Sequence, residues 1–83
     1  MSKQIKVGMI GCGYWGPKLI RNFGRIQGSS VEIVSDINEA RLNRIKEEYP
    51  FILTTRDPSE VIRNREVDAI AIQLPSELTT PWL

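Results

Sequence analysis

Residues 5–23, IKVGMIGCGYWGPKLIRNF, decide how the rest of the chain is interpreted. The stretch opens with a short apolar run, residues 5–10, which predicts a buried strand. Gly11, Gly13 and Gly16 follow at the spacing G-x-G-x-x-G, and a helical pattern begins directly after them. A strand, a glycine-rich turn and a helix in this order are typical of dinucleotide-binding folds.

Each glycine of this turn has its own physical role. Gly11 permits a tight turn out of the strand, Gly13 lets a pyrophosphate approach the backbone, and Gly16 lets the helix pack closely on the strand. The unpaired N–H groups and partial positive charge of the helix N-terminus would then face the phosphates. Pro17 suits the first helical turn, because its missing N–H has no helical partner there.

An acidic residue ends the second apolar run. Asp36 closes the run that starts at residue 31, roughly 20 residues after the glycines, where an acid binds the ribose hydroxyls of NAD. NADP is disfavoured, since its 2′-phosphate would meet a carboxylate; Arg41 could offset this, or could be a solvated helix charge. The alternative for the whole pattern is a strand–helix turn with a capping aspartate, and the joint match favours the cofactor site.

Composition and charge exclude several classes of protein. The chain of 83 residues makes one small domain, residues 1–83, and its net charge of +1 indicates neither a nucleic-acid partner nor a membrane surface. No apolar run is long enough to span a membrane. The sequence contains no His, which excludes His-based triads and His metal sites within the chain. The single Cys12 cannot form an internal disulfide, so we expect a cytoplasmic location.

Short apolar runs alternate with helical stretches, as in βαβ units around a parallel sheet. Right-handed crossovers then predict an α/β fold, a partial Rossmann fold with about four parallel strands in the order 3-2-1-4 and three flanking helices. We expect strands over residues 5–10, 31–35, 51–53 and 68–74. We expect helices over residues 14–23, after an N-cap at Asn38, and after an N-cap at Asp57.

Helix ends and helix faces are predicted as well. Gly24 is a plausible C-cap of the first helix. The expected buried positions are Trp15, Leu19, Ile20 and Phe23 in the first helix, Leu42, Ile45 and Tyr49 in the second, and Val61 and Ile62 in the third.

Three segments together resemble the N-terminal NAD(P)-binding domain of the glucose–fructose oxidoreductase/inositol dehydrogenase (Gfo/Idh/MocA-type) family. They are VGMIGCGYWGPKLIRNF, VSDINEARLNRIKEEYP and TTRDPSEVIRNREVDAIAIQLP. The phrase GCGYWGPKLIRNF is the most specific and looks like members that act on nucleotide sugars or cyclic polyols. The resemblance implies an oxidoreductase, a dehydrogenase that transfers a hydride between a sugar or polyol carbon and a nicotinamide.

The same resemblance implies roles for individual residues. The phosphate loop would use the three glycines and the backbone N–H groups of two aromatic residues, and Trp15 could equally be a core anchor. Asp36 would hold the adenosine ribose, Ile37 would lie against the adenine, and the end of the fourth strand would approach the nicotinamide ribose. The implied cofactor-binding residues are Gly11, Gly13, Tyr14, Trp15, Gly16, Asp36, Ile37, Gln73, Leu74 and Pro75.

Departures from the family pattern limit what the chain is expected to do alone. Family members usually have Ala-Thr-Pro at the end of the fourth strand and then a histidine, whereas this chain has Gln73-Leu74-Pro75 and then Thr79. The family's catalytic lysine, in a Glu-Lys-Pro motif after the next strand, and its C-terminal substrate domain lie beyond the last residue given. We therefore expect NAD binding without turnover; the alternatives are a stand-alone nucleotide-binding or regulatory module, or an interaction remnant.

The fourth predicted strand, residues 68–74, would be a long apolar edge, which is an aggregation liability. We expect this edge to be covered by the tail through Trp82, or by a second copy of the chain in a homo-oligomer. A twofold dimer through this strand would pair the two copies in antiparallel fashion.

Overall fold

The computed structural model describes residues 4–11, 16–26 and 28–73. Within these ranges the strands form one parallel, four-stranded sheet with the order β3-β2-β1-β4. The predicted fold class, strand order and three helices are confirmed. The elements are β1 Ile5–Ile10, α1 Gly16–Arg25, β2 Ser29–Ser35, α2 Glu39–Glu48, β3 Leu53–Thr55, α3 Pro58–Arg63 and β4 Ala69–Ile72.

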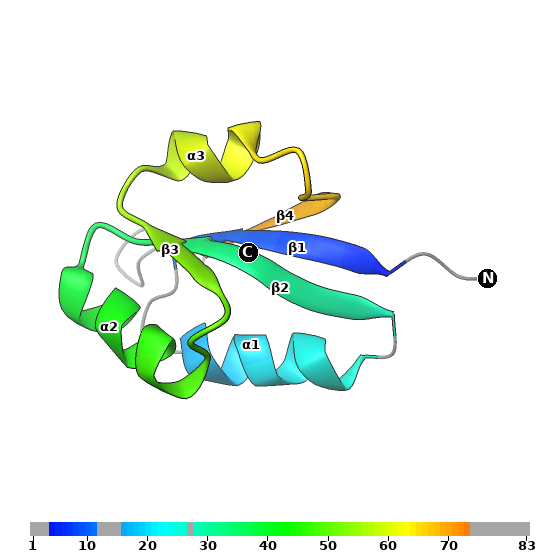
Figure 1. Ribbon diagram of the computed structural model, residues 1–83, viewed down its shortest axis with the longest axis horizontal. Coiled ribbons are helices and arrows are strands. Elements are labelled where there is room, and N and C mark those ends of the chain that lie inside the picture. Colours follow the sequence, from blue (N-terminus) through cyan, green and yellow to red (C-terminus); the bar gives the residue numbers. More distant parts are fainter. Residues whose placement is uncertain (1–3, 12–15, 27, 74–83) are drawn as a thin grey trace, which may run out of the picture.

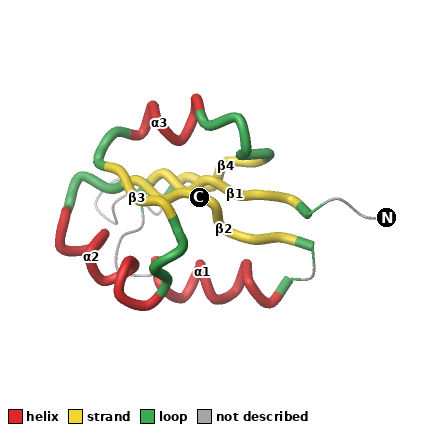
Figure 2. Tube along the Cα trace, viewed as in Figure 1, coloured by secondary structure: helices red, strands yellow, loops and turns green. Residues whose placement is uncertain are grey.

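The helices cover the sheet unequally. Helices α1 and α2 lie on one face and α3 lies on the other (Figure 1). The chain runs outward from β1 through β2 to β3 and then returns to β4 on the far side of β1 (Figure 2). The strand order therefore reverses between β1 and β4, which is the position where open α/β sheets bind their ligands.

The main core lies between the sheet and the α1–α2 layer. It forms because alternate strand residues point to this face and meet the apolar stripes of both helices. Helix α1 contributes Ile20, with Leu19 and Phe23 partly buried beside it, as predicted. The remaining core residues are Val7 and Met9 of β1, Val31 and Val34 of β2, Leu42 and Ile45 of α2, and Ile52.

The two predicted N-caps are confirmed. The Oδ1 atom of Asn38 accepts a hydrogen bond from the backbone N–H of Arg41 at 3.2 Å, which satisfies one of the free donors at the start of α2. The Oδ1 atom of Asp57 accepts from the N–H of Ser59 at 2.9 Å, and Pro58 follows as the first residue of α3.

The predicted C-cap at Gly24 is wrong. Helix α1 continues through Gly24 to Arg25, and the glycine with a positive φ, 92°, is Gly28. The Phe23 carbonyl near the helix end accepts from the N–H of Ile26 at 3.2 Å and from the hydroxyl of Ser29 at 2.8 Å.

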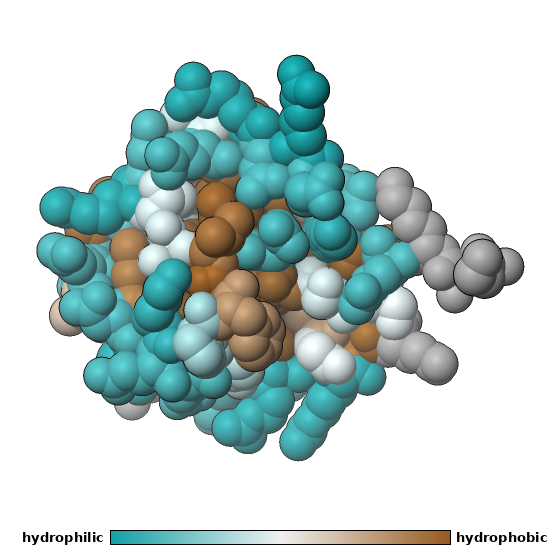
Figure 3. Space-filling model, viewed as in Figure 1, coloured by the Kyte–Doolittle hydropathy of each residue, from teal (hydrophilic) through white to brown (hydrophobic). Residues whose placement is uncertain are grey.

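The third strand lies two residues later than expected. Residues Leu53–Thr55 pair with Ile33–Ser35. Ile52 is instead buried in the core, and its N–H donates to the carbonyl of Tyr49 at 3.0 Å in a turn. Phe51 is consequently 79% exposed, and Leu53 is 49% exposed. Apolar surface is visible in the middle of the face on which β3 lies (Figure 3).

The predicted burial of Ile62 in α3 is also wrong, since this residue is exposed. Ile70 and Ile72 of β4 are exposed as well. Helix α3 has six residues and packs mainly against β1 and β2, so it leaves β4 uncovered. Strand β4 is also shorter than predicted, and the tail proposed to cover it, with Trp82, lies outside the described residues.

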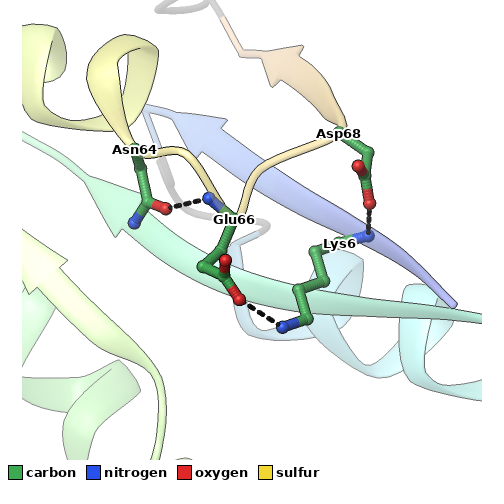
Figure 4. Close-up of polar contacts among 4 residues, drawn as sticks. All are labelled: Lys6, Asn64, Glu66 and Asp68. Carbon is green, nitrogen blue, oxygen red and sulfur yellow. Dashed lines mark hydrogen bonds and ion pairs between the residues drawn. The ribbon is translucent and has the colours of Figure 1, made fainter.

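A polar cluster fixes β4 against β1 at the amino ends of the strands. The backbone N–H of Lys6 donates to Oδ2 of Asp68 at 2.9 Å, and the N–H of Asp68 donates to the Lys6 carbonyl at 2.7 Å. Figure 4 shows that the Lys6 side chain also reaches Oε1 of Glu66, at 2.9 Å. The Oδ1 atom of Asn64 accepts a hydrogen bond from the backbone N–H of Glu66 at 2.8 Å. These contacts lie at the amino end of the sheet, whereas the predicted site lies at the carboxyl end.

Candidate functional site

The carboxyl ends of three neighbouring strands bring predicted site residues together. Gly11 directly follows β1, Asp36 follows β2, and Gln73 follows β4. Backbone hydrogen bonds between neighbouring strands continue to these residues. The N–H of Gly11 donates to the Ser35 carbonyl at 2.8 Å, and the N–H of Gln73 donates to the Ile10 carbonyl at 2.9 Å. The three residues therefore lie along one edge of the sheet, across the point where the strand order reverses.

Gly11 is required by its backbone and by its neighbour. Its φ is +83°, a conformation that side chains with a β-carbon rarely adopt. A β-carbon there would also lie 2.5 Å from the carbonyl oxygen of Gln73. This confirms the predicted tight turn and shows that it brings the end of β1 against the end of β4.

Helix α1 begins at Gly16, further along the chain. Gly16, its first residue, is buried, as expected for a glycine that allows close packing of the helix. The N–H groups in the first turn of a helix have no helical partners, and they carry the positive end of its dipole. An anion placed at the carboxyl end of β1 would face this end of α1.

Asp36 is buried, with 8% of its surface exposed, and it is held on two sides. Its backbone N–H donates to the carbonyl of Thr55 at 3.1 Å. Its Oδ1 atom accepts from the N–H of Asn38 at 2.8 Å, so the carboxylate folds back on its own chain in an Asx turn. The carboxylate is thus oriented before any ligand arrives.

Arg41 approaches the second oxygen of this carboxylate. Its Nη1 atom lies 4.0 Å from Oδ2 of Asp36, and its side chain is 48% exposed. Both interpretations of Arg41 are therefore partly correct: the side chain is half solvated, and it is within ion-pair range of the site. Such a partly exposed pair contributes little stability by itself.

Ile37 lies beside the buried carboxylate and is 81% exposed. A large apolar side chain with this exposure, next to an oriented acid, provides a surface on which a flat ring can stack. The structure thus places Ile37 next to Asp36 and on the surface.

The sequence missed two groups that support the site. Ser35 is buried. Its carbonyl accepts a hydrogen bond from the N–H of Gly11, and its hydroxyl donates to the Met9 carbonyl at 3.4 Å. Asn38 was assigned only as a helix cap, whereas its N–H also orients Asp36. The spacing Asp-x-Asn is the signal that predicts such a turn. The predicted residues Gly13, Tyr14, Trp15, Leu74 and Pro75 lie outside the described residues, as does Cys12.

These residues fit a dinucleotide. The close approach at Gly11 leaves no room for a β-carbon, Asp36 presents an oriented acceptor, and Ile37 supplies an exposed apolar face. Among residues 4–11, 16–26 and 28–73, no cluster of His, Cys, Asp or Glu side chains is suited to hold a metal ion. None of the helices in these ranges is long and apolar enough to cross a membrane.

Comparison with known proteins identifies the family. Residues 5–81 match the model of the GFO_IDH_MocA family, described as an oxidoreductase family with an NAD-binding Rossmann fold. The chain belongs to this Gfo/Idh/MocA family. The match covers the fold and all of the predicted cofactor-binding residues.

Inositol dehydrogenases are among the relatives in sequence. The chain is 32% identical over 79 residues to an inositol 2-dehydrogenase of Arthrobacter sp. (strain FB24), and covers 23% of its length. It is 36% identical over 69 residues to inositol 2-dehydrogenase 2 of Paenarthrobacter aurescens, and covers 20% of it. These alignments take in 94% and 82% of the present chain. The chain thus spans less than a quarter of the length of these relatives.

Solved structures agree with this assignment. The apo scyllo-inositol dehydrogenase from Lactobacillus casei superposes with a TM-score of 0.78 at 27% identity, over 92% of this chain and 23% of that one. The structure of scyllo-inositol dehydrogenase from the same organism with bound NAD(H) and scyllo-inositol gives a TM-score of 0.77 at 26% identity, with the same coverage. The Rossmann-type fold of the present chain is therefore shared with these scyllo-inositol dehydrogenase structures.

Proposed function

We propose that this Gfo/Idh/MocA chain binds NAD as the cofactor domain of an oxidoreductase acting on a cyclic polyol. The observation that carries the proposal is the buried, oriented carboxylate of Asp36 at the end of β2. A paired acceptor at this position suits the two hydroxyls of the adenosine ribose. The names of the relatives, inositol dehydrogenases, support the class of substrate.

Different residues of this chain would contact different parts of the cofactor. The turn at Gly11 and the start of α1 at Gly16 would receive the pyrophosphate. Asp36 would hold the adenosine ribose, and Ile37 would lie under the adenine. The nicotinamide ribose would reach the end of β4. The family resemblance adds Gly13, Tyr14 and Trp15 to the phosphate loop, and Gln73, Leu74 and Pro75 to the nicotinamide side.

The bound nicotinamide would accept or release a hydride at the substrate carbon. This chain's part is to fix the orientation of the cofactor, because a hydride moves only between closely placed and aligned carbons. We assign no catalytic residue within the 83 residues. Turnover of the polyol is accordingly proposed for the whole enzyme, of which this chain corresponds to the cofactor domain.

We also propose a preference for NAD over NADP. A 2′-phosphate would be brought against the buried carboxylate of Asp36, and like charges at close range repel. Arg41 reduces this repulsion, since its guanidinium lies 4.0 Å from the same carboxylate and is half exposed. We therefore expect weak residual NADP binding, which the Arg41→Ala variant loses, whereas Arg44→Ala, an exposed neighbour on the same helix, leaves it unchanged.

Thermal unfolding with and without nucleotide tests the cofactor site. NAD⁺ at about 100 times its dissociation constant adds roughly 2.7 kcal/mol to the stability of a protein that binds it only when folded. We expect NAD⁺ to raise the melting temperature of the wild type and to leave that of Asp36→Ala unchanged. A wild type that does not respond to millimolar NAD⁺ would refute the proposal and favour the interaction-remnant interpretation.

Self-association through β4 stays a prediction. Ile70 and Ile72 of this strand are 42% and 66% exposed, and the one strand that pairs with β4 in the described part of the chain is β1. Light scattering measures the result: a dimer that Ile72→Lys converts into a monomer is expected. A wild type that is monomeric at all concentrations contradicts the prediction.

A further inference from the structure

Thr55, the last residue of β3, connects Asp36 to the start of α3. Its carbonyl accepts the hydrogen bond from the backbone N–H of Asp36 at 3.1 Å. Its hydroxyl oxygen, Oγ1, accepts from the backbone N–H of Asp57 at 3.1 Å and donates to Oε2 of Glu60. Thr55 therefore contacts the turn after β2 through its backbone and the first turn of α3 through its side chain.

The hydroxyl of Thr55 is inserted into the cap of α3. In an ordinary capping box, the acidic side chain at the third helical position reaches back to the backbone N–H of the N-cap residue. Asp57 is the N-cap here and Glu60 is the third helical residue, but the Asp57 N–H donates to the Thr55 hydroxyl, which in turn donates to Glu60. The single proton of this hydroxyl is thus donated within the protein and not to a ligand.

Strand β3 is held by few other contacts. It has three residues, and the strand that pairs with it in the described part of the chain is β2. Leu53 is 49% exposed, and Thr54 and Thr55 are only partly buried. An edge strand with so little buried surface opens locally more readily than the core does. The hydrogen bonds of the Thr55 hydroxyl therefore supply a second point of attachment at the end of β3 that adjoins Asp36.

We propose that Thr55 is a positioning residue, which acts on the cofactor through Asp36 without touching the cofactor itself. Its side chain fixes the end of β3, and this fixes the carbonyl that holds the backbone of Asp36. This inference rests on the proposed NAD-binding function. It extends that function by assigning the contacts between β3 and α3 to cofactor selectivity. A displaced carboxylate binds the ribose of NAD less well, and it also repels the 2′-phosphate of NADP less strongly.

Thr55→Val tests the role of the hydroxyl, because it removes this group and leaves the backbone carbonyl in place. We expect NAD⁺ to bind about fivefold more weakly in calorimetric titrations, as for the loss of one hydrogen bond. The affinity for NADP⁺ should fall by less, because the displaced carboxylate repels the 2′-phosphate less strongly. The ratio of the NAD⁺ affinity to the NADP⁺ affinity should therefore fall. A general loss of structure would weaken both nucleotides equally and leave this ratio unchanged.

Thr54→Val is the matched control, since it makes the same change at the neighbouring residue, on the opposite face of the strand. It should keep the wild-type ratio. A second pair of variants changes the other end of the connection, at the exposed Glu60. Glu60→Ala removes the acceptor and should lower the ratio, whereas Glu60→Gln keeps an acceptor oxygen and should preserve it. Thr55→Ser keeps the hydroxyl and should likewise preserve the ratio.

Hydrogen exchange at the backbone amide of Asp36 measures the connection directly. This N–H donates to the Thr55 carbonyl, so its exchange reports how firmly the end of β3 is held. We expect faster exchange in Thr55→Val and in Glu60→Ala than in the wild type. The exchange rate in Thr54→Val should be that of the wild type.

The affinity ratios decide between the alternatives. An unchanged ratio in Thr55→Val, or an equal fall in Thr54→Val, would overturn the role of Thr55 and leave the cofactor site in place. Equal effects of Glu60→Ala and Glu60→Gln would overturn it too, and this pair decides the question if Thr55→Val does not fold. A wild type that binds neither NAD⁺ nor NADP⁺ would refute the proposed function, and this inference with it.

Discussion

A β-carbon placed on Gly8 would lie 2.6 Å from Cγ1 of Val61. Gly8 is in the middle of β1, and Val61 is the fully buried residue of α3. The two atoms cannot approach so closely, and Cγ1 and Cγ2 of Val67 lie 3.2 Å from the same point. Glycine at this position therefore lets α3 lie directly on the sheet, on the face opposite α1 and α2.

Alanine at Gly8 should accordingly destabilise the fold. Val61 is fully buried, so the added methyl group should force it and α3 away from the sheet, at a cost of about 1–3 kcal/mol. Urea unfolding monitored by circular dichroism measures the change. Gly24→Ala is the control: it is an exposed helical glycine with no atom within 4 Å of the added carbon, and it should stabilise by about 0.5–1 kcal/mol. Equal effects of the two substitutions would contradict this account.

This contact also shows where prediction from the sequence stops. The strand order, the caps at Asn38 and Asp57, and the positions of Gly11 and Asp36 are signalled by local spacing, and the structure confirms them. The role of Gly8 depends on its contact with Val61, which is more than fifty residues away in the sequence. No local sequence pattern predicts this contact.

The predictions that the structure contradicts also failed because they depend on packing and not on local sequence. Residues 51–53 have the apolar composition of a strand, but Ile52 is drawn into the core beneath the sheet, which moves the paired segment to Leu53–Thr55. Ile62 is apolar but exposed, although it directly follows the fully buried Val61 in the same helix. The side-chain oxygen of Gln73, Oε1, is buried without a hydrogen-bond donor among the described residues, and this state likewise depends on the surrounding packing and has no signature in the sequence.

The Lys6–Glu66 pair should respond to high pH. The hydrogen bond from Lys6 to Glu66, together with the negative charge of Glu66, raises the pKa of Lys6 above its ordinary value of 10.5. A raised pKa in the folded state means that the stabilisation is complete below the unfolded pKa and is lost as pH rises through the folded one. Wild type and Glu66→Gln should therefore differ in melting temperature at about pH 9 and converge towards about pH 12.

The size of this effect is limited by solvent screening, because the side chains of Lys6 and Glu66 are 36% and 64% exposed. Nuclear magnetic resonance titration of the Lys6 side chain supplies the direct measurement. Its pKa should fall towards 10.5 in Glu66→Gln. An unchanged titration would show that the ion pair does not form in solution.

The cap of α3 should respond to low pH. The hydroxyl and the N–H of Ser59 both donate to Asp57, and these bonds lower the pKa of its carboxyl below the ordinary value of 3.8. A lowered pKa in the folded state means that the stabilisation is present above the unfolded pKa and is lost as pH falls through the folded one. The melting temperature should therefore contain a contribution that disappears below about pH 4.

Asp57→Asn is the matched control for this titration, because asparagine keeps the capping oxygen but cannot be protonated in this range. The difference between wild type and Asp57→Asn should shrink as pH falls from about 6 to about 3. A constant difference over this range would show that the charge of Asp57 does not contribute to the cap.

Gly11→Ala should remove nucleotide binding and stability together. Its φ of +83° disfavours alanine, and the added carbon would lie 2.5 Å from the backbone carbonyl of Gln73, which cannot rotate away as a side chain would. Gly28→Ala separates the two effects, since Gly28 has a φ of +92° and no atom within 4 Å of the added carbon. The free energy of unfolding of Gly28→Ala should fall by only about 1–2 kcal/mol, the cost of a left-handed conformation for alanine. This variant should keep its response to NAD⁺. Gly11→Ala should lose about 1–3 kcal/mol more and show no thermal shift with NAD⁺, because the ends of β1 and β4 are forced apart. Equal destabilisation by the two substitutions, with NAD⁺ binding retained in both, would mean that the contact between Gly11 and Gln73 does not shape the site.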